Sequence, residues 1–401
     1  MVTLKKEACT LKNGKLYYFN GKGIRVTKKS WQKISGNKYI QIGSKGYVVS
    51  KIEKTKNIWK YHKYSYQKKK WLKQKNVWLT VSKKKYYFNN AGNCTHIYDS
   101  AAQKYYDYRD GAMTVVKNDV RSIGKKEYYF GSNGIKSSVP GLYLTASGTL
   151  VYAAADGCVT KKIYGEIQAY TEAEGRITSC RIKEDHYMSY YNGNGDAVRK
   201  IDLYQPMVAL TYDDGPSVHT WAILDVLAQN GGVATFFVVG QQVPANSAVV
   251  RRAVELGCEI GNHTYSHQNL TKVGVAAIQS QIWTTNFMVQ NAAGVCPVVM
   301  RPPGGNYNHT VQNTVGMPII LWSIDTLDWK TRNAASTQAA VLNHVKDGDI
   351  ILMHDLYSQT ADASRVIIPE LKNRGYQLVT ISELADCRGP IYGGGVYHSL
   401  P

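Results

Sequence analysis

The chain has 401 residues, 44% of them hydrophobic, which is enough for at least two domains that each bury a core. Its formal net charge of +20 is concentrated at one end: residues 1–100 hold 24 Lys and Arg against 3 Asp and Glu, and the remainder is nearly neutral. No run of about 18 apolar residues occurs, which excludes a helical membrane span, and export would need a signal that the given sequence does not carry.

Residues 1–200 carry a repeat rich in tyrosine. An aromatic or apolar pair is followed four residues later by Gly, as in residues 18–19 before Gly23 and residues 87–88 before Gly92. These glycines recur about every twenty residues, and 22 of the 30 tyrosines lie in this half. Because one short hairpin cannot bury its own face, the units are predicted to stack as a solenoid-like all-β hairpin-repeat domain.

The units at residues 16–23 and 85–92 resemble the cell-wall-binding repeats of Gram-positive surface proteins, of the choline- and glucan-binding type. Where those repeats usually have Trp before the tyrosine pair, this chain has Leu16, Lys85 or Glu127. A cage for a quaternary ammonium needs that ring. The lysine runs of this half instead favour an anionic wall polymer, peptidoglycan or teichoic acid, as partner.

Nucleic acid is the rival partner for this basic half, because lysines interleaved with aromatic residues can bind single strands by phosphate contact and stacking. The sequence contains no recognised RNA- or DNA-binding signature, so we expect no nucleic-acid partner. The seven cysteines are scattered without the spacing of a zinc finger or a disulfide framework, and only a bridge from Cys258 to Cys296 is left open.

From Pro206 onward, apolar runs alternate with helical patterns. We predict strands at residues 208–212, 234–239, 259–261, 298–300, 319–324, 350–353 and 377–381. We predict helices between them at residues 220–229, 247–256, 276–290, 336–344 and 364–374. About seven strand–helix alternations indicate a parallel sheet closed as a (β/α) barrel, with the chemistry where strands end. The predicted domains are residues 1–200 and 201–390, with a C-terminal tail at residues 391–401.

Two adjacent carboxylates, Asp213 and Asp214, follow an apolar strand and precede a Gly-Pro turn. Like charges a few ångströms apart cannot both ionise cheaply, so a positive group is expected beside them, and a metal ion would serve. His263 and His267 are spaced so that both imidazoles lie on one face of a helical turn and can share a metal. With Asp214 they offer two nitrogens and one oxygen, which is typical of a catalytic site with open positions.

Three further motifs follow predicted strands. Arg301 opens Arg-Pro-Pro-Gly-Gly, and an arginine fixed at a strand end can keep a carboxylate ionised, while Gly304 offers a backbone N–H. Asp328 lies in Asp-Thr-Leu-Asp-Trp and His354 in Leu-Met-His. A histidine near carboxylates can be held protonated and used as a general acid. Taken singly, each motif also fits a plain loop or a core strand.

In this order the five motifs resemble those of the NodB-type polysaccharide deacetylases, carbohydrate esterase family 4, over roughly residues 205–385. The resemblance implies an α/β fold: a distorted (β/α) barrel of the NodB type, here preceded by the all-β repeat domain. It implies a metal-dependent hydrolase whose divalent ion, Zn²⁺ or alternatively Co²⁺ or another ion, is held by Asp214, His263 and His267.

The resemblance also implies the catalytic roles. Asp213 would be the general base, with Arg301 holding it ionised, and His354 would be the general acid, tuned by Asp328. The remaining site residues would be Trp329 and Leu352, which line the pocket for the acetyl methyl group, and Gly304, whose N–H serves as an oxyanion donor. Where the family often has an aromatic residue after the prolines, this chain has Gly304, so we expect a more open groove wall.

The expected function is removal of acetyl groups from N-acetylated cell-wall polysaccharide, with N-acetylglucosamine of peptidoglycan as substrate. Such an enzyme would be extracellular and attached to a Gram-positive wall by its repeats. Two alternatives stay open on the sequence: an esterase that removes O-acetyl groups from xylan, and a wall-binding surface protein without turnover. The esterase would differ from the first hypothesis in the leaving group. The surface protein would differ from it by releasing no acetate.

Overall fold

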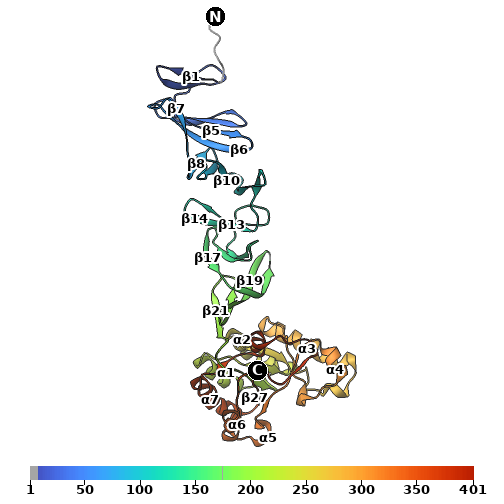
Figure 1. Ribbon diagram of the computed structural model, residues 1–401. Helices are drawn as coiled ribbons and strands as arrows, with labels where there is room; N and C mark the ends of the chain where they lie inside the picture. The colour runs from blue at the N-terminus through green and yellow to red at the C-terminus, as the bar shows by residue number, and fades with distance from the viewer. Residues whose placement is uncertain (1–7, 174) are drawn as a thin grey trace. The chain divides into compact units, whose positions relative to one another are not determined.

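The computed structural model describes residues 8–173 and 175–401 and divides into two compact units. The N-terminal unit runs to Glu184 and includes Ser189–Arg199; the C-terminal unit comprises Asp185–Met188 and Lys200–Pro401. Strands build the first unit, whereas all helices that the structure describes belong to the second (Figure 1). Within the described residues, no helix is both long enough and apolar enough to cross a lipid bilayer.

The N-terminal unit consists of antiparallel strands joined mostly by short turns. They form two five-stranded meanders (β3 to β7 and β8 to β12), two separate hairpins (β1–β2 and β13–β14), and a sheet of β15 to β21. Their bounds are β1 Ala8–Lys12, β2 Lys15–Phe19, β3 Ser30–Ser35, β4 Lys38–Ile42, β5 Val48–Thr55, β6 Ile58–Ser65, β7 Lys70–Lys73, β8 Val77–Val81, β9 Lys84–Phe88, β10 Cys94–Asp99, β11 Lys104–Arg109, β12 Ala112–Val115, β13 Asp119–Ile123, β14 Lys126–Phe130, β15 Gly141–Leu144, β16 Leu150–Ala153, β17 Val159–Ile163, β18 Glu166–Ala173, β19 Arg176–Glu184, β20 Tyr187–Asn192 and β21 Ala197–Asp202.

One turn geometry recurs through this unit. In each case a glycine with positive φ donates its N–H to the carbonyl oxygen three residues earlier, and that earlier residue donates its own N–H to the residue after the glycine. The glycines concerned are Gly23, Gly46, Gly92, Gly134, Gly148, Gly157 and Gly195. They include the glycines of the sequence repeat. Stacking of the units as a solenoid stays a prediction.

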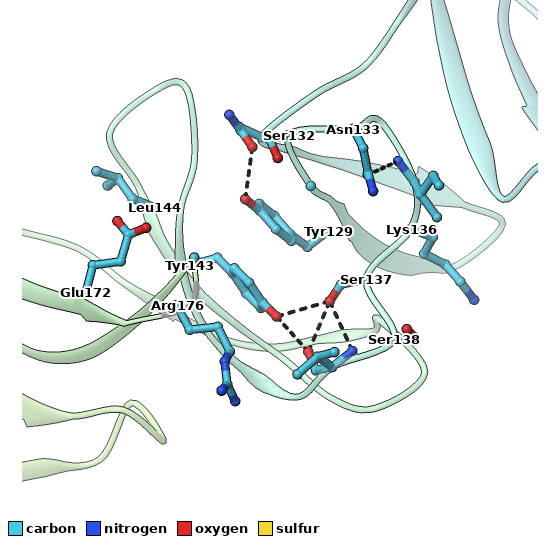
Figure 2. Close-up of a pocket in the computed structure, with 15 residues that line it drawn as sticks. Tyr129, Ser132, Asn133, Lys136, Ser137, Ser138, Tyr143, Leu144, Glu172 and Arg176 are labelled. Carbon is cyan, nitrogen blue, oxygen red and sulfur yellow. Dashed lines mark hydrogen bonds between the residues drawn. The ribbon is translucent and has the colours of Figure 1, made fainter.

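Several repeat tyrosines lie inside the unit rather than on its surface. Tyr129 and Tyr143 are both buried, and their rings stack with centroids 4.4 Å apart. Figure 2 shows the two rings side by side. They line a hollow of about 620 Å³, and the Tyr143 hydroxyl donates to the Val139 carbonyl at 2.8 Å. One face of each ring is therefore covered by the other ring, while both side chains also line the hollow.

The C-terminal unit is an α/β fold around parallel strands, in the order β24-β23-β22-β27-β26, with β28 also pairing with β22. Its strands are β22 Met207–Asp213, β23 Thr235–Val238, β24 Glu259–Asn262, β25 Ile319–Ile320, β26 Ile324–Asp325, β27 Ile350–His354, β28 Gln377–Leu378 and β29 Val396–Tyr397. Its helices are α1 Thr220–Gln229, α2 Ser247–Glu255, α3 Val275–Ala293, α4 His309–Val315, α5 Asp328–Thr331, α6 Ala334–Leu342, α7 Ser358–Asn373 and α8 Ile381–Arg388.

The sheet closes into a ring through short bridges. Met300 pairs with Asn262 of β24 on one side and with Ile319 of β25 on the other. A few residues later the chain changes neighbour, and Ile324 of β26 pairs with Ile351 of β27. These bridges join the two edges of the open sheet, which gives the distorted barrel.

Three strand predictions were wrong in extent. Residues 298–300 contribute only the bridge at Met300; residues 319–324 split into β25 and β26; and residues 377–381 form the short β28 followed by α8, which begins at Ile381. Helices α4, α5 and α8 were not predicted, because they are short or lie within runs that are as apolar as a strand. The described residues contain no bridge between Cys258 and Cys296.

Strand β22 is the centre of the C-terminal unit. All seven of its residues are buried, and it pairs in parallel with β27 from Ala209 to Asp213 and with β23 from Thr211 to Asp213. Asp213 lies directly opposite His354 in this register. Because parallel strands end at one edge of the barrel, the register brings the ends of β22, β23 and β27 together.

The recurrent turns of the N-terminal unit give a test of its packing. A methyl group at Gly157 would lie 2.4 Å from the carbonyl oxygen of Ser137, whereas at Gly148 it would meet no atom within 4 Å. Both residues have positive φ, so Gly148→Ala should cost about 1 kcal/mol of unfolding free energy from backbone strain alone. Gly157→Ala should cost at least about 1 kcal/mol more because the backbone must also move. Urea unfolding followed by near-ultraviolet circular dichroism measures both; equal losses would contradict the packing described here.

Candidate active site

Asp213 and Arg301 form a buried ion pair at the end of β22. The Arg301 guanidinium is fully buried, and its Nη1 donates to Asp213 Oδ1 at 2.7 Å. The same guanidinium donates to the Thr211 hydroxyl and to the carbonyl oxygens of Ile320 and Leu321. Burial lowers the pKa of Arg301 and the Asp213 carboxylate opposes that change. A charge fixed by four acceptors holds the carboxylate in one orientation.

Three side chains converge beside this pair. Asp214 Oδ1 lies 3.2 Å from His263 Nε2 and 3.0 Å from His267 Nε2, and the three offer ligand atoms within 4.8 Å of one another. The prediction that the two histidines share a helical turn was wrong. Residues 263–267 form an irregular loop, in which Thr264 and His267 have positive φ. Gln281 of α3 holds this loop, because its Oε1 accepts hydrogen bonds from the backbone N–H groups of Tyr265 and Ser266.

The donor set fits a divalent cation. His263 Nδ1 contacts the carbonyl oxygen of Arg301 at 2.7 Å, and a carbonyl can only accept, so this nitrogen carries the proton. In the neutral ring, Nε2 then presents a lone pair toward Asp214 rather than an N–H. Consistently, Asp214 Oδ1 is buried without a hydrogen-bond donor among the described residues. Lone pairs from two imidazoles and a carboxylate aimed at one point suit Zn²⁺, Co²⁺ and similar ions.

His354, at the end of β27, is held by Asp328. Its Nδ1 donates to Asp328 Oδ1 at 2.8 Å, and its backbone N–H donates to Asp328 Oδ2 at 2.8 Å. Thr360 of α7 donates to the same Oδ2 at 2.6 Å. Burial by itself lowers the pKa of His354, but Asp328 and the carboxylates of Asp213 and Asp214 raise it above its ordinary value. Burial raises the pKa of Asp328, and the bonds from His354 and Thr360 bring it below its ordinary value.

The other predicted site residues lie around these groups. Trp329, at the start of α5, is 46% exposed, whereas Leu352 of β27 is buried. Gly304 follows Pro303 with φ +64°, a left-handed conformation that favours glycine. The roles of these three residues toward an acetyl group stay predictions.

Sequence reasoning missed several residues that hold the site together. Thr211, Gln281 and Thr360 orient the arginine, the histidine loop and Asp328, respectively. Thr211 could have been recognised, because it opens the Asp213–Asp214 motif, but Gln281 and Thr360 carry no local signal. Asp355, next to His354, is buried under Gly215 and accepts from the Thr220 hydroxyl. Burial, aided by the nearby carboxylates of Asp214 and Asp213, raises the pKa of Asp355 to about 7.

The sequence of the C-terminal unit is similar to those of known proteins. A family profile described as polysaccharide deacetylase matches residues 200–317. The chain is similar to the peptidoglycan-N-acetylglucosamine deacetylase PgdA of Listeria monocytogenes serotype 1/2a, with 43% identity over 178 residues, 44% of this chain and 38% of that protein. It is 40% identical over 189 residues to the peptidoglycan-N-acetylmuramic acid deacetylase PdaC of Bacillus subtilis, covering 47% and 40% of the two chains.

A third relative matches over most of its own length. It is a peptidoglycan-N-acetylglucosamine deacetylase of Bacillus cereus, 36% identical over 189 residues, which is 45% of this chain and 88% of that protein. In contrast, the chain spans only about two fifths of the length of the Listeria and B. subtilis relatives. These matches fall on less than half of this chain, the extent expected of its C-terminal α/β unit.

The convergent donors predict a stability change on metal binding. Adding Zn²⁺ to chelator-treated protein at about 100 times its Kd should raise the unfolding free energy of the C-terminal unit by about 2.7 kcal/mol, since only the folded state presents the three ligands together. Asp214→Asn should remove most of the gain, and His309→Ala, which changes an exposed histidine outside the cluster, should retain it. Thermal unfolding with and without Zn²⁺ provides the measurement. An undiminished gain in Asp214→Asn would contradict the assigned ligands.

Proposed function

Because the chain belongs to the polysaccharide deacetylase family, we propose that it hydrolyses the N-acetyl groups of a bacterial cell-wall polysaccharide, with N-acetylglucosamine of peptidoglycan as substrate. The observation that carries this proposal is the arrangement at the end of β22. A carboxylate fixed by a buried arginine lies directly beside the convergent Asp214, His263 and His267, and opposite a histidine paired with Asp328.

Hydrolysis of an acetamide needs an activated water molecule and a protonated leaving group. A divalent ion held by Asp214, His263 and His267 would lower the pKa of water to about 7 and polarise the acetyl carbonyl. Asp213 accepts the proton of the attacking water as its oxygen bonds to the acetyl carbon. Arg301 holds the Asp213 carboxylate in place for this step, because its Nη1 donates to Oδ1 at 2.7 Å.

His354 completes the reaction as the acid. Its Nδ1–H is committed to Asp328, so Nε2 is the nitrogen left to carry a proton toward the substrate. The carbon–nitrogen bond breaks as that proton passes to the amine nitrogen, giving acetate and a free amino sugar. An amine leaves poorly unless it is protonated, which is why the raised pKa of His354 suits amide hydrolysis at neutral pH.

We further propose that the N-terminal unit binds an anionic wall polymer. The evidence for this proposal is the charge: the lysines of residues 1–100 account for most of the net positive charge of the whole chain. Aromatic rings hold some of these cations close to the surface, as for Lys15 over Tyr47 and Lys51 over Trp71. Attachment to the wall would keep the enzyme near its substrate and place it outside the cell.

The direct test is acetate release from N-acetylglucosamine oligomers and from peptidoglycan. Release should stop on chelation and return with Zn²⁺ or Co²⁺. Asp213→Asn and His354→Ala should each lower kcat by at least about 100-fold, the scale of a lost general base or acid, while still binding metal. Turnover at the wild-type rate in either variant would exclude the role given to that residue. Release from acetylated xylan but not from the oligomers would favour the esterase alternative.

The pH profile tests the pairing of His354 with Asp328. The acid must be protonated, so kcat should fall as pH rises through the raised pKa of His354, above its ordinary value. Asp328→Asn removes the charge that raises this pKa, so the alkaline limb should move to lower pH and kcat should drop by about 100-fold or more. Asp362→Asn, on an exposed carboxylate of α7, is the matched control and should leave the limb in place. An unmoved limb in Asp328→Asn would disprove the coupling.

A further inference from the structure

Helix α5, which carries Asp328 and Trp329, is a single turn with a left-handed residue at each end. Leu327 precedes it with φ 53° and ψ 25°, and Arg332 follows it with φ 48° and ψ 36°. A residue in this position after a helix is usually Gly or Asn, because a Cβ makes the conformation unfavourable by about 1 kcal/mol or more. The backbone conformation therefore does not explain an arginine at position 332.

Two contacts fix the Arg332 side chain. Its Nε donates to the carbonyl oxygen of Trp329 at 2.8 Å, and its guanidinium lies over the ring of Tyr357, 3.3 Å from the centroid. These contacts use one N–H and one face of the group. In the part of the chain that the structure describes, no carboxylate lies within 4 Å of this guanidinium, although it is a planar fork suited to one.

The fork lies at the edge of the active site. The Tyr357 ring on which it rests is 6.2 Å from the ring of His354, the residue placed here as the acid. Trp329, whose carbonyl it binds, is the exposed ring next to Asp328. One aromatic ring, that of Tyr357, therefore links Arg332 to His354.

We propose that Arg332 is a substrate-binding residue that recognises a carboxylate carried by the glycan. The inference rests on the proposed function and deepens it: the substrate class becomes a polysaccharide with carboxylate substituents near the acetamide, rather than a neutral N-acetylglucosamine polymer. In peptidoglycan such a group comes from the lactyl ether of muramic acid or from the attached peptide. The shared chemistry is a planar carboxylate that accepts two parallel N–H bonds from a guanidinium.

A purely structural role would have a different signature. If Arg332 served only to close the α5 turn, Asn would replace it with little loss, since Asn tolerates the left-handed conformation and Asn333 already caps α6. Every substrate would then be affected equally. A binding role instead predicts a loss confined to substrates that carry the charge.

The experiment compares three soluble oligomers: a neutral N-acetylglucosamine tetramer, a muramic-acid-containing tetramer with free lactyl carboxylates, and the same tetramer with those groups converted to carboxamides. Arg332→Asn should lower kcat/KM for the carboxylate oligomer by about 10- to 100-fold, the range of one charge-assisted hydrogen bond. It should change kcat/KM for the other two by less than about threefold. A fourth oligomer bearing stem peptides separates the two carboxylate sources.

Two variants serve as controls. Lys330→Gln removes a positive charge from the same turn without touching Tyr357 or Trp329 and should leave all three kcat/KM values unchanged. Arg332→Lys keeps the charge but not the fork, so the preference for carboxylate over carboxamide should fall by less than in Arg332→Asn. The thermal midpoint of Arg332→Asn should stay at or above that of the wild type.

Calorimetric binding of the same oligomers to Asp213→Asn protein separates this inference from the proposed function. If the wild type releases no acetate but still binds the carboxylate oligomer more tightly than the carboxamide, and Arg332→Asn erases that difference, the activity fails and the inference stands. If acetate is released from all three oligomers and Arg332→Asn lowers every rate equally, or none, the inference is overturned while the activity stands.

Discussion

The buried pair of Asp213 and Arg301 is the interaction on which the active site depends. A guanidinium with no exposure to solvent would be prohibitively unfavourable alone, and a carboxylate beside a second carboxylate would be driven toward its neutral form. Together they neutralise each other, and three further N–H groups of Arg301 donate to two carbonyl oxygens and the Thr211 hydroxyl. Breaking such a pair typically costs 3–5 kcal/mol. The position of the Asp213 carboxylate is therefore fixed by the same contacts that compensate the buried guanidinium.

From that pair, the parallel register distributes the other functions. Arg301 follows the bridge at Met300, and its carbonyl oxygen contacts His263 Nδ1, so one residue orients both Asp213 and His263, the proposed base and a proposed metal ligand. Opposite Asp213, β27 ends at His354, whose backbone and ring are both bound by Asp328. Asp213 and His354, the proposed base and acid, thus lie on neighbouring strands, and each has a charged partner from another part of the unit. The rigid strands β22 and β27 fix the positions of Asp213 and His354 more closely than loops alone would.

The sequence predicted the parts of this site that have a local signature. Adjacent carboxylates after an apolar strand, paired histidines and an arginine before two prolines are recognisable one motif at a time, and helix α1 was predicted at its observed bounds. What could not be predicted depends on distant contacts. The histidine loop is irregular because Gln281, fourteen residues beyond His267, binds its backbone, and spacing alone suggested a helical turn instead. The strand at residues 319–324 splits because its two ends pair with different neighbours, and no local pattern encodes a change of partner.

Arg332 shows how a violated local rule can point to function. Natural sequences agree with their backbone at most positions, and disagreement concentrates where a side chain is needed for something else. Non-glycine residues occupy the left-handed region in several turns of this chain, for example at Lys56 and Gln103, and the turn after α5 has an arginine there whose side chain is held by two contacts. Its neighbours have fixed that arginine without neutralising it, beside the histidine that must deliver a proton. A charge held rigid and left available at the rim of a site is arranged for a ligand of opposite charge, and a wall glycan offers carboxylates for that purpose.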